Sequence, residues 1–104
     1  MDLSELRKEI DQIDEDLIRL FCKRMNVSSK IADYKKATGS PIYHPGREQE
    51  ILQKVAQKVG PELKSYACTL YSTLFEVSRN YQSKRNENDT TQISETLSEN
   101  NEVV

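Results

Sequence analysis

Residues 20–36, LFCKRMNVSSKIADYKK, lie within a longer pattern whose apolar positions recur at alternating spacings of three and four residues. Such a pattern is typical of one buried face of a long α-helix. We name these apolar positions the seam: Leu3, Leu6, Ile10, Ile13, Leu17, Leu20, Val27, Ile31 and Tyr34. Between Leu20 and Val27, where the spacing calls for another aliphatic residue, stands Arg24. The sequence therefore places a guanidinium on the face that the helix should bury.

The helix that carries the seam is predicted to span about a third of the chain, from near Leu3 to about Thr38. Asp2 or Ser4 can cap its N-terminus, and neither Gly nor Pro interrupts it before Gly39, where Gly39 and Pro41 end it. Its length is about 50 Å at 1.5 Å per residue. A helix of this length cannot bury its seam inside a small monomer, so we expect it to lie along other helices.

Two shorter helices are predicted after a connector that contains two prolines and a glycine. The second helix covers residues 47–59, and the third begins at Pro61 and ends near Gln82. Their apolar stripes are Ile51, Leu52, Val55 and Val59 in the second, and Leu63, Ala67, Leu70, Leu74 and Val77 in the third. With 31% charged residues and only three Gly, the composition also favours an all-α fold of three helices.

The chain divides into a helical domain, residues 1–83, and a polar tail, residues 84–104. The tail has five acidic and two basic residues and few aliphatic ones, so we predict that it is disordered. A domain of this size with sparse apolar residues favours oligomerisation.

Several classes of function are disfavoured by the composition. The net charge of −2 argues against a nucleic-acid-binding protein, and neither a signal peptide nor an apolar run of membrane-spanning length is present. Cys22 and Cys68 are isolated, as expected of reduced cysteines in the cytoplasm. His44 is the only histidine, which excludes a multi-histidine metal site.

Each predicted helix carries polar residues on its inward face. Lys35 follows Arg24 by eleven residues and therefore lies about 20° from it around the helix. Glu48 heads the stripe of the second helix, and Ser78 and Gln82 continue the stripe of the third. Buried charges are costly unless they are paired, so these residues together predict a polar pocket.

Taken singly, these residues also have structural interpretations. Arg24 can extend its charged end to solvent, and Lys35 suits the C-terminal end of a helix dipole. The others can be ordinary terminal, loop or surface residues: Arg7, His44, Arg47, Glu48, Ser78 and Gln82. Their combination instead favours an anionic ligand, because cations predominate and an arginine fork binds carboxylate through two hydrogen bonds.

Arg7 cannot share this pocket within one chain. On a single helix it lies about 25 Å from Arg24 and about 42 Å from Lys35. If Arg7 contributes to a pocket, that pocket must belong to another chain.

Three stretches of the sequence occur together in order: LRKEIDQIDEDLIRLFCKRMNVSSKIADYKK, REQEIL and SRNYQ. With these stretches at the expected spacing, about residues 3–83 of the sequence resemble the all-α class of chorismate mutases. The resemblance implies an intertwined homodimer in which each active site receives Arg7 from the partner subunit. The implied reaction is the Claisen [3,3] rearrangement of chorismate to prephenate, on the route to phenylalanine and tyrosine, without cofactor or metal.

The resemblance also implies roles for individual residues. Lys35 and Gln82 donate to the ether oxygen whose bond breaks, and Glu48 accepts from the ring hydroxyl. Arg24 and Arg7 of the partner subunit hold the carboxylates. Ser78 and Arg47 assist them. His44 stands where several relatives have an aspartate, so its contribution is through either its backbone or its side chain.

Three further points follow from the resemblance. Many relatives are fused to another enzyme of the aromatic pathway, and the short tail here predicts a monofunctional chain that can still associate with such an enzyme.

A lyase of the same fold, which converts isochorismate to salicylate and pyruvate, is an alternative function, and Arg47 with Glu48 favours the mutase over it. A non-catalytic helical dimerisation or regulatory module is a second alternative, disfavoured because a scaffold gains stability when inward charges are replaced by apolar residues.

Overall fold

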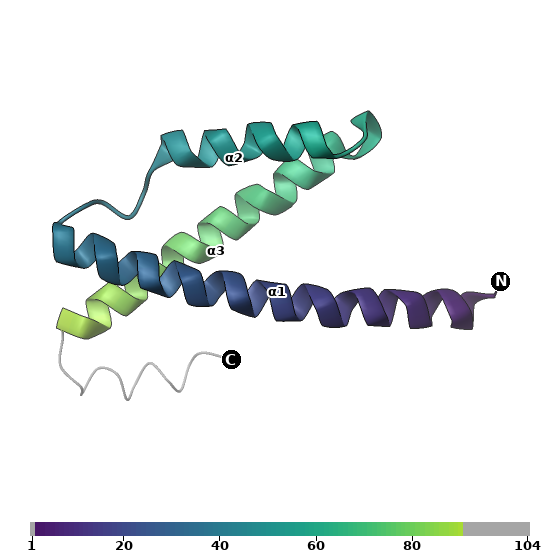
Figure 1. Ribbon diagram of the computed structural model, residues 1–104, viewed down its shortest axis with the longest axis horizontal. Coiled ribbons are helices and arrows are strands. Elements are labelled where there is room, and N and C mark those ends of the chain that lie inside the picture. Colours follow the sequence, from purple (N-terminus) through teal and green to yellow (C-terminus); the bar gives the residue numbers. More distant parts are fainter. Residues whose placement is uncertain (1, 91–104) are drawn as a thin grey trace.

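The computed structural model describes residues 2–90, with backbone only for residues 88–90. Three α-helices, α1 (Leu3–Thr38), α2 (Pro45–Lys58) and α3 (Lys64–Thr90), account for most of this part of the chain (Figure 1), together with a 3₁₀ turn, η1 (Pro61–Leu63). No strand occurs among the described residues, which confirms the all-α prediction. None of the helices described combines the length and the apolar character needed to cross a membrane.

The ends of α1 are determined by local sequence signals. The Asp2 carboxylate accepts a hydrogen bond from the backbone N–H of Glu5 at 2.9 Å, which makes Asp2 the N-cap. At the other end Gly39 adopts the left-handed conformation, with φ of 70°, and the N–H of Ser40 donates to the carbonyl of Lys35. Both ends agree with the prediction from the sequence.

The second helix begins earlier than predicted. Its first residue is Pro45, two residues before Arg47, because a proline at the first helical position lacks only an N–H that would have no partner in the helix. His44 is the N-cap: its Nδ1 accepts a hydrogen bond from the N–H of Arg47 at 3.0 Å. The apolar stripe of α2 is half-buried, as predicted.

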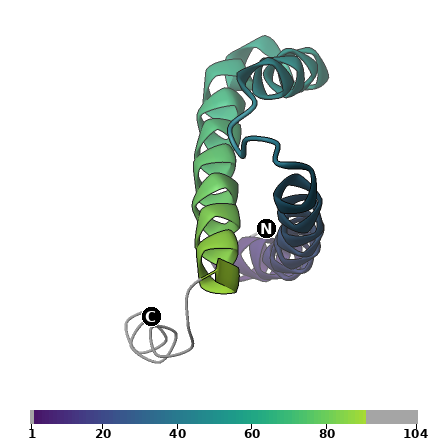
Figure 2. The ribbon, with the colours of Figure 1, turned by 90° about the vertical axis from the view of Figure 1, so that its left-hand side faces the viewer.

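The third helix packs against both α1 and α2. Figure 2 shows α3 along one side of the molecule and the other two helices on the opposite side. Its buried face differs from the expected stripe. Phe75, Ser78 and Gln82 are buried, whereas Leu70 is 57% exposed. A rotation of the buried face towards Phe75 brings the polar pair Ser78 and Gln82 against α1.

The third helix also ends later than predicted, at Thr90 rather than near Gln82. Residues 84–90, expected to belong to a disordered tail, are helical. A tertiary contact accounts for part of this extension, because Arg85 donates from Nε and Nη2 to the two carboxylate oxygens of Asp33, each at 3.1 Å. The remainder of the predicted tail, residues 91–104, lies outside the described residues.

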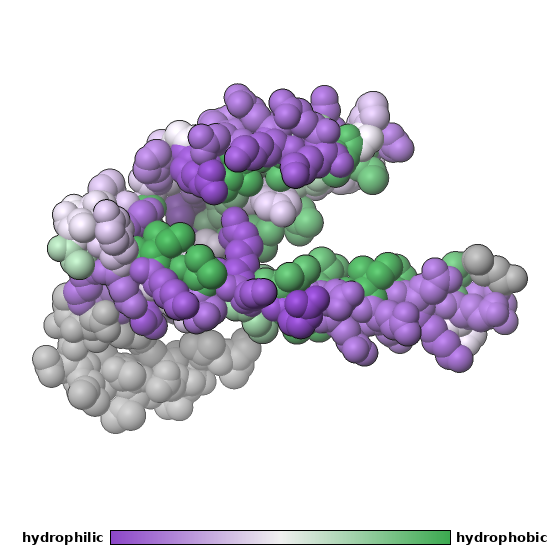
Figure 3. Space-filling view, viewed as in Figure 1, coloured by the Kyte–Doolittle hydropathy of each residue, from purple (hydrophilic) through white to green (hydrophobic). Residues whose placement is uncertain are grey.

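The seam is not buried within the chain. Its members are between 41% and 67% exposed, and Ala32 and Phe75 are the only buried apolar residues among those described. The radius of gyration is 17.4 Å, whereas a compact domain of 100 residues has about 13 Å. In Figure 3, apolar side chains line the upper edge of the projecting N-terminal half of α1, and this edge faces the open space below α2. This exposed face is an unpartnered helix surface.

Candidate active site

A cavity of about 650 Å³ lies between the C-terminal half of α1, the connector, the start of α2 and the C-terminal half of α3. Its apolar lining comprises Val27, Ile31, Ile42, Ile51 and Phe75. Its polar lining comprises Arg24, Ser28, Lys35, His44, Arg47, Glu48, Glu50, Ser78, Arg79 and Gln82. A pocket of this size with a few convergent polar groups is typical of a small-molecule site.

Arg24 enters the cavity from α1. The seam spacing turns it towards α3, where its Nη1 donates to Ser78 Oγ at 3.1 Å and its guanidinium carbon lies 6.0 Å from the centre of the Phe75 ring. The side chain is half-buried, and no carboxylate among the described residues pairs with it. Arg24 therefore has a neutral partner on one nitrogen and further N–H donors available.

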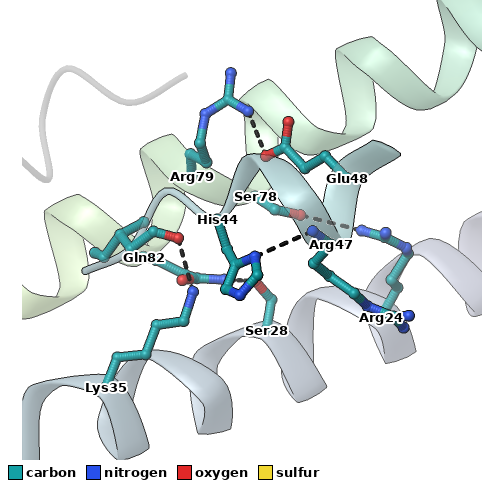
Figure 4. Close-up of polar contacts among 10 residues, drawn as sticks. Arg24, Ser28, Lys35, His44, Arg47, Glu48, Ser78, Arg79 and Gln82 are labelled. Atoms are coloured by element: carbon teal, nitrogen blue, oxygen red, sulfur yellow. Dashed lines mark hydrogen bonds and ion pairs between the residues drawn. The ribbon is translucent and has the colours of Figure 1, made fainter. Parts of the chain in front are cut away.

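Lys35 is the second cation of the cavity without an acidic partner in the described part of the chain. Its Nζ donates to the backbone carbonyl of Ile42 in the connector at 2.7 Å. Figure 4 shows its side chain rising from α1 towards Gln82 of α3. An ammonium has three donors, so this contact leaves two for another acceptor.

Gln82 is only 7% exposed and lies beside Ser28 of α1. Its Nε2 donates to Ser28 Oγ at 2.8 Å, and its Oε1 is buried without a hydrogen-bond partner. A hydroxyl can donate or accept, so a half-turn of the amide keeps the Ser28 contact and exchanges the two amide groups. An unsatisfied buried amide atom is costly, and a bound ligand could provide its missing partner.

Arg47 and Glu50 lie at the mouth of the cavity. Arg47 Nη1 donates to Glu50 Oε1 at 2.8 Å, and both side chains are more than half exposed. This hydrogen bond lowers the pKa of the Glu50 carboxyl below its ordinary value, and the positive charge of Arg47 adds to the effect. Arg47 therefore has a partner that is itself accessible to solvent.

Glu48 is held by a residue that the sequence reasoning missed. Arg79 of α3 donates from Nη1 to Glu48 Oε2 at 2.5 Å, and its guanidinium carbon lies 4.9 Å from the centre of the Tyr43 ring. Arg79 precedes Gln82 by three residues and follows Phe75 by four, so helical spacing already places it on the same face. That spacing is the signal in the sequence from which Arg79 could have been predicted as a site residue.

The lining of the cavity carries excess positive charge. Its ionised side chains are four cations, Arg24, Lys35, Arg47 and Arg79, and two carboxylates, Glu48 and Glu50. Each carboxylate pairs with one arginine, which leaves the charges of Arg24 and Lys35 uncompensated. No cluster of three potential metal-binding side chains was found among the described residues. The arrangement is suited to binding a small dianion.

Seven of the eight predicted site residues line this one cavity: Arg24, Lys35, His44, Arg47, Glu48, Ser78 and Gln82. Arg7 does not line it. It is exposed on the projecting half of α1, as the distance along the helix required. Besides Arg79, the sequence reasoning missed Ser28. Nothing in the local sequence indicates that this buried serine accepts a hydrogen bond from Gln82.

The sequence is similar to that of known proteins of one family. The sequence model of the family "Chorismate mutase type II" matches residues 6–83. A bifunctional chorismate mutase/prephenate dehydratase of Aquifex aeolicus is 44% identical over 54 residues, and a chorismate mutase of Methanocaldococcus jannaschii is 36% identical over 53 residues. An intracellular chorismate mutase of Mycolicibacterium smegmatis is 30% identical over 69 residues. No solved structure gives a significant match.

Each aligned segment covers only part of this chain and only part of the relative. They cover 52%, 51% and 66% of this chain in the Aquifex, Methanocaldococcus and Mycolicibacterium comparisons, respectively. They cover 15%, 54% and 66% of those relatives.

Proposed function

The chain belongs to the chorismate mutase type II family, and we propose that it catalyses the intramolecular rearrangement of chorismate to prephenate. The observation that carries this proposal is the pair Arg24 and Lys35: two half-buried cations in one cavity, neither with an acidic partner in the described part of the chain. Chorismate is a dianion, so its charge matches the uncompensated charge of the cavity.

Binding restricts the substrate to reactive conformers. The enolpyruvyl arm of chorismate must fold over the ring before the new carbon–carbon bond can form. Arg24, already oriented by Ser78, would hold one carboxylate through the N–H groups that Ser78 does not use. Because the reaction has a single reactant, the gain comes from restricting its conformation: with both ends of the molecule held, the arm is kept over the ring in the geometry from which the bond forms.

The second contribution is electrostatic. As the ether carbon–oxygen bond breaks, negative charge grows on that oxygen, and donors that already point at it stabilise the transition state more than the substrate. Lys35 retains two N–H donors. A half-turn of the Gln82 amide, which replaces Nε2 by Oε1 in the contact with Ser28, would direct its N–H groups at the ether oxygen. Neither residue exchanges a proton or forms a covalent bond in this reaction.

We propose that the active form is a homodimer that covers the seam. The exposed seam extends along α1 beyond the region where α3 packs, and a second copy of the same helix presents a matching apolar face. Antiparallel pairing of two α1 helices about an axis near residues 15–16 would put Arg7 of the partner subunit opposite Arg24. Each cavity would then gain a third uncompensated cation.

Two further parts of the proposal rest on the names of the relatives. The Aquifex protein is named as both a chorismate mutase and a prephenate dehydratase, so we propose that this chain passes prephenate to an enzyme of the aromatic pathway with which it can associate. The Mycolicibacterium relative is named as intracellular, and we propose a cytoplasmic location here. Co-elution of the purified chain with a prephenate dehydratase in gel filtration would test the association.

The proposed activity is tested by following chorismate through its ultraviolet absorbance and identifying the product by proton NMR, with a metal chelator present. We expect chelator-resistant loss of chorismate, with prephenate as product. Persistence of chorismate at high enzyme concentration would contradict the proposal. Isochorismate would then be offered, and release of pyruvate from it would identify the lyase instead.

A further inference from the structure

Arg79 joins three parts of the cavity wall. It projects from α3, pairs with Glu48 on α2, and covers the ring of Tyr43 in the connector. Figure 4 shows the Arg79 guanidinium directed at the Glu48 carboxylate. The two side chains are 33% and 21% exposed, so water screens this ion pair less than the exposed pair of Arg47 and Glu50.

The contact engages only one oxygen of the carboxylate. Arg79 binds Oε2 of Glu48, and Oε1 accepts no hydrogen bond from the described residues. A carboxylate oxygen that is fixed and free is a ready acceptor for a hydroxyl group. Without Arg79, the Glu48 side chain would lose the partner that selects this orientation, and a half-buried charge would remain unpaired.

Arg79 differs from the other cations of the cavity in one respect. Its charge is already balanced by Glu48, whereas Arg24 and Lys35 have neutral partners. A ligand carboxylate would therefore have to displace Glu48 in order to bind Arg79. At Arg24 or Lys35 it would displace no carboxylate. The stacking contact with Tyr43 further restricts the guanidinium.

We propose that Arg79 is a positioning residue, braced by Tyr43, that holds Glu48 with Oε1 open to the ring hydroxyl of the substrate. This inference rests on the proposed function. It makes Arg79 and Tyr43 determinants of specificity for the hydroxyl, with no direct part in binding the carboxylates.

The test compares chorismate with an analogue in which hydrogen replaces the ring hydroxyl. The hydroxyl takes no part in the bonds that form and break, so the analogue can still rearrange. A hydrogen bond to a charged group predicts that the wild type prefers chorismate, in kcat/KM, on the order of tenfold to a hundredfold. Arg79→Gln should lower kcat/KM for chorismate about tenfold and leave that for the analogue nearly unchanged, so the preference collapses.

Three further variants sharpen the comparison. Tyr43→Ala removes the ring that Arg79 covers and should lower the preference in the same direction, whereas Tyr43→Phe keeps that ring and should preserve it. Arg19→Gln is the charge-matched control, because Arg19 is exposed and pairs only with Asp16 on its own helix. Circular dichroism establishes that each variant keeps its helical content.

The outcomes separate this inference from the proposed function. An inactive wild type would overturn the proposed function. An active wild type, with chorismate and the analogue slowed equally by Arg79→Gln, would assign Arg79 a structural role only and overturn the inference. If Arg79→Gln does not fold, Tyr43→Ala decides: a reduced preference supports the inference, and an unchanged preference overturns it.

Discussion

The guanidinium of Arg24 on α1 donates from Nη1 to the hydroxyl of Ser78 on α3, at 3.1 Å and across 54 positions of sequence. This contact explains why an arginine stands in an apolar seam. The side chain is turned inward and oriented, but its charge is left without a counter-ion in the described part of the chain. A cation arranged in this way is suited to bind an anion that residues 2–90 do not supply.

Removal of the Ser78 hydroxyl should weaken substrate binding. In Ser78→Ala, Arg24 loses its only hydrogen-bond partner among the described residues, and we expect kcat/KM for chorismate to fall about tenfold, at the low end of the ~1.5–3 kcal/mol that a hydrogen bond to a charged group contributes. Most of the loss should be in KM. Ser29→Ala is the matched control, because Ser29 is equally buried but donates to the carbonyl of Asn26 on its own helix. Equal effects of the two substitutions on KM would contradict this account of Arg24.

Active sites shared between subunits predict complementation. Arg7→Ala and Lys35→Ala should each be inactive alone, since every site then lacks one cation. After co-refolding of equal amounts, about half of the dimers carry one chain of each kind, and one of their two sites is intact, so about a quarter of wild-type activity should return. The measurement is chorismate turnover, with heterodimer formation followed by differently sized affinity tags. No recovery in a sample that contains the heterodimer would contradict sharing of Arg7.

A charge in the seam should prevent dimerisation. Ile13 is 54% exposed in the single chain, and Ile13→Glu would bury two carboxylates, one from each subunit, in the proposed interface. We expect sedimentation equilibrium to report a monomer for this variant at concentrations where the wild type is dimeric. Gln12→Glu adds the same charge at an exposed position beside the seam and should remain dimeric. A dimeric Ile13→Glu variant would contradict the use of the seam as the interface.

The Asp33–Arg85 pair should stabilise the fold in a pH-dependent manner. The hydrogen bond from Arg85 lowers the pKa of the Asp33 carboxyl below its ordinary value. Because the folded-state pKa is the lower one, the stabilisation is fully present above the unfolded-state pKa and is lost as the pH falls through the folded-state pKa. Asp33→Asn should therefore lower the melting temperature near neutral pH, and the difference from wild type should shrink in acid.

Asp16→Asn is the control for that experiment, because the Asp16–Arg19 ion pair lies within α1 and joins no two helices. Thermal melts followed by circular dichroism at fixed protein concentration, from neutral pH into the acid range, give the comparison. A difference between Asp33→Asn and wild type that persists at the lowest pH would show that the pair does not act through the carboxylate charge.

The features that sequence predicted best depend on local signals. The N-cap at Asp2, the left-handed Gly39 and the break at Gly60 and Pro61 each act over a few residues. The inward direction of Arg24 and Lys35 followed from helical periodicity alone. These signals are sufficient for the helices and for one side of the cavity.

The features that sequence did not predict depend on contacts between helices. The later end of α3 involves the ion pair between Arg85 and Asp33, which are 52 positions apart, and no local pattern in the sequence predicts that pair. The buried face of α3 is set by what α1 presents to it, so Phe75 rather than Leu70 turns inward. Arg79 and Ser28 gain their importance only once Glu48 and Gln82 are found opposite them.

The most direct test of the central claim is kcat/KM for chorismate in Lys35→Ala, measured beside Lys30→Ala, which removes an exposed lysine from the same helix. Loss of a donor to the developing charge predicts a decrease of about 10²–10³-fold, or roughly 2.7–4 kcal/mol, for Lys35→Ala. Lys30→Ala should match the wild type. If both variants rearrange chorismate at the wild-type rate, the unpaired cations of this cavity do not carry the reaction, and the account is wrong.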